Sequence, residues 1–221
     1  MISPTAFVKA LFITFEGTEG GGKSTQIALL AERLRERGRT VRLLREPGGT
    51  PIGEEIRHTL KHSAQNAAMT AEAELLLMNA SRAQLVREVI RPALAAGEMV
   101  LCDRFYDSTT AYQGYGRQLD LPTVQRIIDF AVGDTRPNLT LLLQVPLEVS
   151  EARRRSRQAE LPLAQPVRDR MEEADRAFFE RVAQGFAAIA ATEPERVRWI
   201  DATQGIPAVQ EEIWRQVEPL L

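Results

Sequence analysis

Residues 17–24 read GTEGGGKS and match the phosphate-binding loop pattern G-x-x-x-x-G-K-[S/T] at every fixed position. An apolar run at residues 10–15 precedes the loop, and apolar side chains recur behind it at the spacing of one helix face, at Ile27, Leu30, Ala31 and Leu34. The pattern requires this order of strand, glycine turn and helix. A glycine-rich turn that merely precedes a lysine is the alternative, and the match of loop and flanks together disfavours it.

The residue types of the loop follow from the physics of anion binding. Glycines let backbone N–H groups turn toward a ligand at the positive end of the following helix. Lys23 can then reach the β- and γ-phosphates, and the Ser24 hydroxyl can join the shell of Mg²⁺. We therefore expect ATP and Mg²⁺ at a loop formed by Gly17, Thr18, Glu19, Gly20, Gly21, Gly22, Lys23, Ser24 and Thr25.

Composition limits the class of protein. The chain has 221 residues, 44% of them hydrophobic, which is enough for the core of a single domain with one mobile appendage. The net charge of −2 does not point to nucleic acid or to an anionic membrane as a partner. No apolar run approaches the length of a bilayer span. With Cys102 as the only cysteine and no secretion-signal layout at residues 1–4, a cytoplasmic protein is expected.

Strand-like and helical segments alternate along the chain. Five short apolar runs, most of them continuous as in parallel strands covered on both faces, lie at residues 10–15, 40–44, 98–102, 139–145 and 196–200. Helical patterns occupy residues 70–96, 122–132, 146–157, 169–191 and 207–217, and Pro92 is expected to bend the first of them. This alternation predicts a three-layer α/β/α fold with a five-stranded parallel sheet, in which ligands bind beyond the carboxyl ends of the strands.

Charged residues follow the second and third expected strands, at the edge where ligands bind. Asp103 closes an apolar run, as a carboxylate on the metal side of a phosphate site does, and we expect it near Mg²⁺ with Ser24. A capping aspartate is the alternative. Arg45 and Arg104 emerge beside the loop, where a guanidinium can grip a second phosphate with two parallel hydrogen bonds. Many arginines of this chain must lie on the surface, but position favours a function for these two.

Several motifs together resemble bacterial thymidylate kinases, a family of P-loop nucleoside monophosphate kinases. They are FEGTEGGGKST at residues 15–25, REPGGT at 45–50, DRF at 103–105, and Ser108 with AYQG at 111–114. RAQ at 82–84 and IDA at 200–202 match as well, so the resemblance runs through nearly the whole chain. The phosphate loop alone is shared with many enzymes, whereas the combination is specific. It implies transfer of the γ-phosphoryl group of ATP to dTMP, giving dTDP for dTTP biosynthesis.

The resemblance also implies a binding site for dTMP. Arg104 and Arg45 would hold the phosphate of dTMP, and Glu19 would approach the 3′-hydroxyl of the sugar. Tyr112 would lie under the deoxyribose, where a ribose 2′-hydroxyl would clash. No general base is expected, because the attacking phosphate oxygen is already an anion at neutral pH.

The thymine base would be bound by a further set of residues. Arg82 would bond an edge carbonyl of the base, and Pro47 would pack near it. The position that usually stacks an aromatic ring on thymine is Met78 in this chain, and a methionine can still cover a ring face with its polarisable sulfur. The remaining expected lining residues are Ser108, Thr109 and Gln113.

A mobile lid is expected at residues 153–170. One branch of the family carries an arginine in the phosphate loop after the acidic residue; here that position is Gly20, so the chain resembles the branch that supplies arginine from a lid. Arg153 and Arg157 lie four apart on one helix face, and DRME at 169–172 resembles a family element. A solvated basic helix is the alternative. The expected catalytic residues are Lys23, Arg104, Arg153, Arg157 and Glu19.

Two other functions compete with this hypothesis. A kinase of another nucleoside monophosphate has the same architecture, and only the resemblance at Tyr112 and Arg82 favours thymine and deoxyribose. A nucleotide switch or an ATPase that moves a partner protein is the second, but the chain lacks an N-K-x-D element and carries two arginines directed at a second phosphate. The sequence does not indicate the oligomeric state directly, but the resemblance implies a homodimer.

Overall fold

A five-stranded parallel sheet forms the centre of the protein, as predicted. The computed structural model describes residues 10–160 and 174–221, without the side chains of residues 154–155 and 157–160. The strands follow the order β2-β3-β1-β4-β5, and every pairing is parallel. Each strand begins and ends within two residues of its predicted bounds: β1 is Phe12–Glu16, β2 is Val41–Arg45, β3 is Met99–Asp103, β4 is Leu139–Gln144 and β5 is Val197–Asp201.

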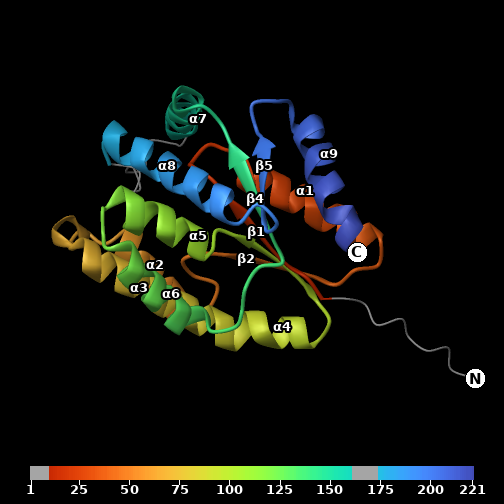
Figure 1. Ribbon diagram of the computed structural model, residues 1–221, viewed down its shortest axis with the longest axis horizontal. Coiled ribbons are helices and arrows are strands. Elements are labelled where there is room, and N and C mark those ends of the chain that lie inside the picture. Colours follow the sequence, from red (N-terminus) through yellow and green to blue (C-terminus); the bar gives the residue numbers. More distant parts are fainter. Residues whose placement is uncertain (1–9, 161–173) are drawn as a thin grey trace, which may run out of the picture.

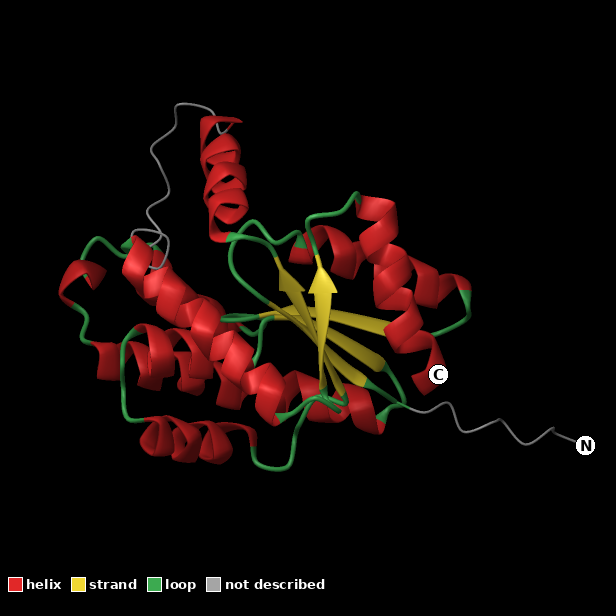
Figure 2. Ribbon diagram, turned by 45° about the horizontal axis from the view of Figure 1, so that its top comes forward, coloured by secondary structure: helices red, strands yellow, loops and turns green. Residues whose placement is uncertain are grey.

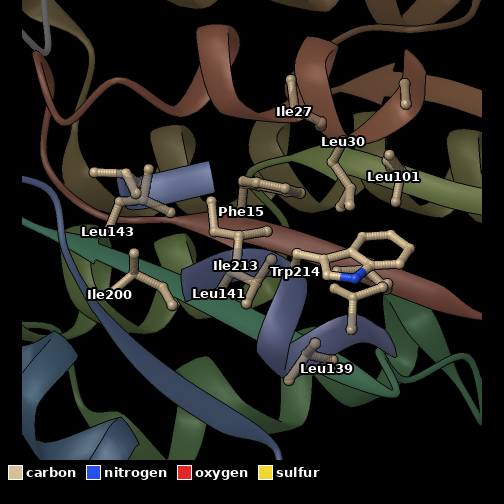
Figure 3. Close-up of a cluster of buried hydrophobic side chains, with 14 of the residues drawn as sticks. Phe15, Ile27, Leu30, Leu101, Leu139, Leu141, Leu143, Ile200, Ile213 and Trp214 are labelled. Atoms are coloured by element: carbon tan, nitrogen blue, oxygen red, sulfur yellow. The ribbon is translucent and has the colours of Figure 1, made fainter. Parts of the chain in front are cut away.

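Helices cover both faces of this sheet, as Figures 1 and 2 show. One face carries α1 (Lys23–Glu36) and α9 (Ile206–Val217), whose apolar side chains pack with those of the strands around Trp214 (Figure 3). A second layer of helices covers the opposite face of the sheet. Its main helices are α2 (Pro51–Lys61), α3 (Ala71–Leu85), α4 (Arg91–Ala95), α6 (Leu121–Val132) and α8 (Arg176–Thr192). β1 is the central strand of the sheet and is buried along its whole length, so its carboxyl end emerges between the two layers of helices.

Three helical regions differ from the sequence-based predictions. The segment predicted at 70–96 is interrupted by a π-helical stretch, Val86–Ile90, directly ahead of α4. Pro92 lies in the first turn of α4, where a missing backbone N–H costs little. The prediction of a helix over residues 169–191 is wrong at residues 174–175, since α8 begins only at Arg176. The Asp175 side chain caps this helix by accepting from the Phe178 N–H at 2.7 Å. Residues 106–116 form an unpredicted helical segment, α5 (Tyr106–Thr109) continued by a π-helical stretch.

The carboxyl ends of the strands bring the sequence motifs to one edge. The Arg104 N–H donates to the Phe15 carbonyl at 2.9 Å, and the Glu46 N–H donates to the Asp103 carbonyl at 2.9 Å. These bonds continue the parallel ladder one residue past the strands, so the loops after β1, β2 and β3 start side by side. No helix in the described part of the chain is both long enough and apolar enough to cross a bilayer.

Candidate active site

The phosphate loop runs from the end of β1 to the start of α1 and is held against β4. At Gly17, φ is +126°, and a Cβ there would lie only 2.2 Å from the Leu143 carbonyl oxygen. Gly22, at the N-cap of α1, has φ of +83°. Both positions require glycine on conformational grounds, and Gly17 requires it on steric grounds as well. The loop therefore presents its backbone to the cleft at the N-terminus of α1, which is an anion-binding geometry.

Lys23 lies folded over this loop. Its ammonium donates to the Thr18 carbonyl at 2.9 Å and to the Gly17 carbonyl at 3.2 Å. Burial lowers the pKa of Lys23, and the nearby Arg104 charge acts in the same direction. Two neutral carbonyls are modest partners for a buried ammonium, so the phosphates of a nucleotide would offer stronger ones.

Ser24 and Asp103 meet across the loop, although 79 residues separate them in the chain. The Ser24 hydroxyl donates to Asp103 Oδ2 at 3.0 Å, in a solvent-exposed position. Both are hard oxygen donors, and Mg²⁺ is typically held by one or two such protein groups together with phosphates and waters. In the described residues no cluster of three or more His, Cys, Asp or Glu could hold a metal alone. The pair therefore fits a magnesium ion that is bound together with a nucleotide.

Beside the loop lies an open cavity, with about 450 Å³ of empty space that is partly continuous with solvent. Nine of the residues that line it were expected from the sequence as binding residues, namely Glu19, Pro47, Met78, Arg82, Arg104, Ser108, Thr109, Tyr112 and Gln113. Lys61, Glu46 and Phe105 complete the lining. The loops after β1, β2 and β3 thus enclose one site with α3 and α5.

Arg104 occupies the end of the cavity next to the phosphate loop. Its φ of +69° places it in the left-handed region, which turns the chain sharply after β3. One terminal nitrogen donates to the Gly17 carbonyl at 3.0 Å and to the Ser108 hydroxyl at 2.9 Å. The other contacts Glu19 at 2.6 Å and the Tyr112 hydroxyl at 3.2 Å. The guanidinium is thus positioned between the loop and the cavity by four protein oxygens.

The charges around Arg104 alter the pKa values of its neighbours. Burial would raise the pKa of Glu19, but Arg104, Lys23 and Lys61 together hold it well below its usual range. Burial raises the pKa of Tyr112 to about 12 even though Arg104 opposes the shift. At neutral pH Glu19 is therefore a carboxylate and Tyr112 a neutral hydroxyl.

Arg82 forms the opposite wall of the cavity from within α3. Its guanidinium is ion-paired with Glu46 at 2.6 Å, and both side chains are almost completely buried. Further hydrogen bonds from Arg82 reach Asn79 at 3.0 Å, Thr109 at 2.9 Å and the Phe105 carbonyl at 3.2 Å. Burial raises the pKa of Glu46, although Arg82 opposes the shift. Arg82 thus joins α3, the loop after β2 and α5 into one rigid wall.

The base end of the cavity is fixed by a buried carboxylate. Gln113 donates its amide nitrogen to Glu74 at 2.9 Å, and Arg117 binds the same carboxylate at 3.0 Å. Met78 lines the cavity one helical turn before Arg82. The expected base-binding residues therefore lie together, in orientations that neighbouring side chains determine.

Arg45 lies apart from this group. Its guanidinium pairs with Glu54 at 3.0 Å, and its side chain is half exposed. Glu54 also accepts from the Gly49 N–H at 2.7 Å, and Arg45 does not line the cavity. The expected contact of Arg45 with the acceptor phosphate stays a prediction.

The expected lid begins in α7 (Leu147–Glu160), which packs on the phosphate loop. The Ser150 hydroxyl donates to the Glu19 carbonyl at 2.6 Å, and Arg153 donates to the Gly20 carbonyl at 3.1 Å. A Cβ on Gly20 would lie 3.0 Å from the Ser150 carbonyl oxygen, so a side chain at this position would require α7 to shift by a few tenths of an ångström. The Arg157 side chain, most of the stretch 153–170 and the element at 169–172 lie outside the described residues.

Glu16 is a site residue that sequence reasoning missed, although it stands in the motif at the end of β1. Its carboxylate accepts from the Phe105 N–H at 2.7 Å and from the Ser108 hydroxyl at 2.5 Å. Burial, with the charge of Asp107, raises the pKa of Glu16 to about 7. Asp107 in turn binds Arg196, the residue directly ahead of β5, at 2.7 Å. These carboxylates support the segment that carries Arg104 and Ser108, and only their partners in space reveal that role.

Comparison with known proteins agrees with this geometry. The family model for thymidylate kinase matches residues 15–213. Thymidylate kinase of Alcanivorax borkumensis is 48% identical over 209 residues, 95% of this chain and 96% of that protein. Thymidylate kinase of Deinococcus radiodurans is 47% identical over 211 residues, 95% of this chain and 97% of that protein. The crystal structure of thymidylate kinase from Ehrlichia chaffeensis superimposes with a TM-score of 0.74 at 34% identity, covering 95% of this chain and 98% of that one. The chain therefore belongs to the thymidylate kinase family.

Proposed function

We propose that this thymidylate kinase transfers the γ-phosphoryl group of ATP to dTMP, giving dTDP and ADP for dTTP biosynthesis, with both nucleotides end to end in the described cleft. One observation carries this arrangement: Arg104, at the end of the acceptor cavity, donates to the carbonyl of Gly17 in the phosphate loop. An acceptor phosphate held by Arg104 would therefore lie next to the γ-phosphate of ATP in that loop. Such proximity is what an in-line displacement needs.

In this mechanism an oxygen of the dTMP phosphate attacks the γ-phosphorus directly. That oxygen is already ionised, so no side chain has to remove a proton. The protein contributes positioning and positive charge. Lys23 would turn from its carbonyl partners to the β- and γ-phosphates, Arg104 would hold the attacking phosphate, and Arg153 and Arg157 from the lid would approach the transferred group. An arginine in that role contributes on the order of 10³-fold or more to the rate of related phosphoryl transfers.

Ser24 and Asp103 would hold Mg²⁺ on the donor side. The ion neutralises charge on the β- and γ-oxygens when it is bound. The support is the 3.0 Å contact between the two side chains at the N-terminus of α1. In the structure the Ser24 hydroxyl donates to the Asp103 carboxylate, and this hydrogen bond keeps the two oxygen donors together.

Selection of dTMP would come from the walls of the cavity. Tyr112 would contact the deoxyribose, and Glu19 its 3′-hydroxyl. Met78 and Pro47 would cover the base, while Arg82 would donate to its edge carbonyl. The N–H groups of Arg82 already have protein acceptors, so a base carbonyl would share one of these donors. The other expected contacts are Ser108, Thr109, Gln113 and, at the phosphate, Arg45.

The decisive experiment measures ADP release with each monophosphate in turn. With saturating Mg·ATP, we expect kcat/KM for dTMP to exceed that for dUMP, dGMP, AMP and CMP. A higher kcat/KM for one of the other monophosphates would identify that compound, and not dTMP, as the acceptor. ADP release that is independent of any acceptor would instead indicate an ATPase.

Quaternary structure and location complete the proposal. We infer a homodimer because Leu76 on α3 and Phe130 on α6 expose 56% and 83% of their surface, on two helices that pack together. Light scattering at micromolar concentration tests it, and a monomeric mass would refute it. A single-domain enzyme of the cytoplasm is supported by Cys102, which is buried as a free thiol.

A further inference from the structure

The charged side chains that line the acceptor cavity divide into two groups. Glu46 and Arg82 form a nearly fully buried ion pair in which each neutralises the other. The remaining group is Glu19, Arg104 and Lys61. Glu19 and Arg104 lie at the end of the cavity next to the phosphate loop, so their pairing can change when an anion enters there.

Arg104 has to change partners to bind an acceptor. Its two terminal nitrogens already contact Gly17, Ser108, Glu19 and Tyr112. Glu19 is the only ionised acceptor among these four, so a phosphate dianion competes with it for the same nitrogen, at 2.6 Å in the present structure. Once Arg104 has turned to the phosphate, the Glu19 carboxylate faces a second anion without its main counter-charge. In a partly buried site that repulsion would oppose binding.

Two lysines remain close enough to offset this repulsion. Burial raises the pKa of Glu19, whereas the charge of Arg104 lowers it, and the charges of Lys23 and Lys61 act in the same direction as Arg104. Lys23 lies over the phosphate loop and would be drawn to the triphosphate of the donor. Lys61 comes from a different element, since it is the last residue of α2, and it lines the acceptor cavity itself.

We propose that Lys61 is a further acceptor-binding residue, whose ammonium supplies the positive charge shared by Glu19 and the acceptor's phosphate when Arg104 exchanges one for the other. A flexible four-carbon stem and a compact ammonium suit this role, because the charge can follow either anion. The ligand class is a nucleoside monophosphate dianion. The inference rests on the proposed function, and it adds α2 to the elements that recognise the acceptor.

The test compares Lys61→Leu and Lys61→Arg with the wild type. Arg215→Gln serves as the matched control, because it removes one positive charge from α9, where Arg215 is exposed and paired with Glu212. Calorimetry gives the affinity of each protein for dTMP and for thymidine, which lacks the phosphate. We expect Lys61→Leu to weaken dTMP binding about tenfold, the size of one charge-assisted contact, and to leave thymidine binding and the KM for ATP unchanged. Lys61→Arg should restore most of the affinity.

Salt provides an independent readout. The affinity of the wild type for dTMP should fall more steeply with ionic strength than that of Lys61→Leu. The variant lacks one ammonium whose attraction to the phosphate salt would screen. Unchanged dTMP affinity in Lys61→Leu would overturn the proposal, and so would an equal loss for thymidine and dTMP, which would mean that the stem only shapes the cavity. If Lys61→Leu melts below the wild type, Lys61→Gln replaces it under the same criteria. Failure of the wild type to phosphorylate dTMP would refute the proposed function instead, since the affinities are measured without turnover.

Discussion

The guanidinium of Arg104 contacts the carboxylate of Glu19 at 2.6 Å, so the acceptor arginine and the acidic residue of the phosphate loop neutralise each other in the structure. The two residues lie in the loops that follow the adjacent strands β1 and β3, and 85 positions separate them in the chain. A ligand phosphate must therefore replace an existing anion rather than fill an uncompensated positive site. We expect this exchange to lower the affinity for the phosphate and to direct it to the nitrogen of Arg104 that contacts Glu19.

Replacement of Arg104 by alanine should separate the two substrates. We expect the KM for dTMP to rise by roughly 10–100-fold, the loss of charge-assisted hydrogen bonds to one phosphate, while the KM for ATP changes little. Steady-state kinetics with each substrate varied in turn measures both constants. Arg104→Lys is the matched control and should retain part of the dTMP affinity. An equal rise of both KM values would contradict the assignment.

Lys23 is predicted to be required for turnover and not for folding. Its side chain bonds only carbonyls of its own loop, at 2.9 and 3.2 Å, so Lys23→Ala should leave the melting temperature close to that of the wild type. The rate of ADP release should fall by at least about 10²-fold because charge stabilisation of the transferred group is lost. Near-normal turnover in a folded variant would show that the loop does not bind the donor phosphates.

Removal of the proposed magnesium ligands should appear as a change in metal dependence. Ser24→Ala and Asp103→Asn each delete one oxygen donor, so the Mg²⁺ concentration that gives half-maximal activity should rise in both variants. Ser63→Ala, which removes a hydroxyl far from the loop in sequence and outside the cavity lining, is the control and should show the wild-type value. If the metal dependence of all three variants coincides with the wild type, Mg²⁺ is held elsewhere.

Glu16 gives the protein a pH-dependent stability. Because its folded pKa is raised to about 7 from a usual 4.5, the folded state holds a proton that the unfolded chain has released between these two values. The contribution of this group to stability is thus fully present below pH 4.5 and is lost as pH rises to about 7. In urea unfolding between pH 4.5 and 8, the free energy of unfolding of Glu16→Gln should increase relative to that of the wild type as pH rises. A constant difference would contradict the raised pKa.

Gly17 should tolerate no side chain. A Cβ would lie 2.2 Å from the Leu143 carbonyl oxygen, so Gly17→Ala must displace either the loop or β4 in addition to its backbone strain of about 1–3 kcal/mol. Gly38→Ala is the control, since Gly38 also has a positive φ, +74°, but has no atom within 4 Å of the added methyl. Chemical unfolding should show the larger loss for Gly17→Ala. Equal losses would mean that the close approach to Leu143 costs nothing.

The sequence predicted the sheet well because each strand is a short apolar run with a turn signal beside it. Phe12 to Glu16 is buried along its full length, and such a run needs no knowledge of distant partners to be recognised. The helical region at 106–116 was not predicted, because its polar residues face the site rather than forming an apolar stripe. The first turn of α8 was misplaced, since its cap is the single side chain of Asp175.

The candidate site was predictable where a motif defines it and not where partners define it. Nine expected binding residues line the cavity; seven of them follow strands that end at one edge, and Met78 and Arg82 lie on α3. Lys61 lies at the end of a helix with no motif of its own, and Glu46 gains its importance only from Arg82, which is 36 residues away. Nothing in the sequence indicated that Arg45 would pair with Glu54. The catalytic and binding roles of all these residues stay predictions.

The contact of α7 with the phosphate loop has a mechanical consequence. Ser150 and Arg153 donate to the carbonyls of two successive loop residues, Glu19 and Gly20, and a Cβ on Gly20 would lie only 3.0 Å from the Ser150 carbonyl oxygen. If the loop moves when it binds a triphosphate, we expect the first turns of α7 to move with it. We therefore expect α7 to couple the binding of a donor nucleotide in the loop to the position of Arg153.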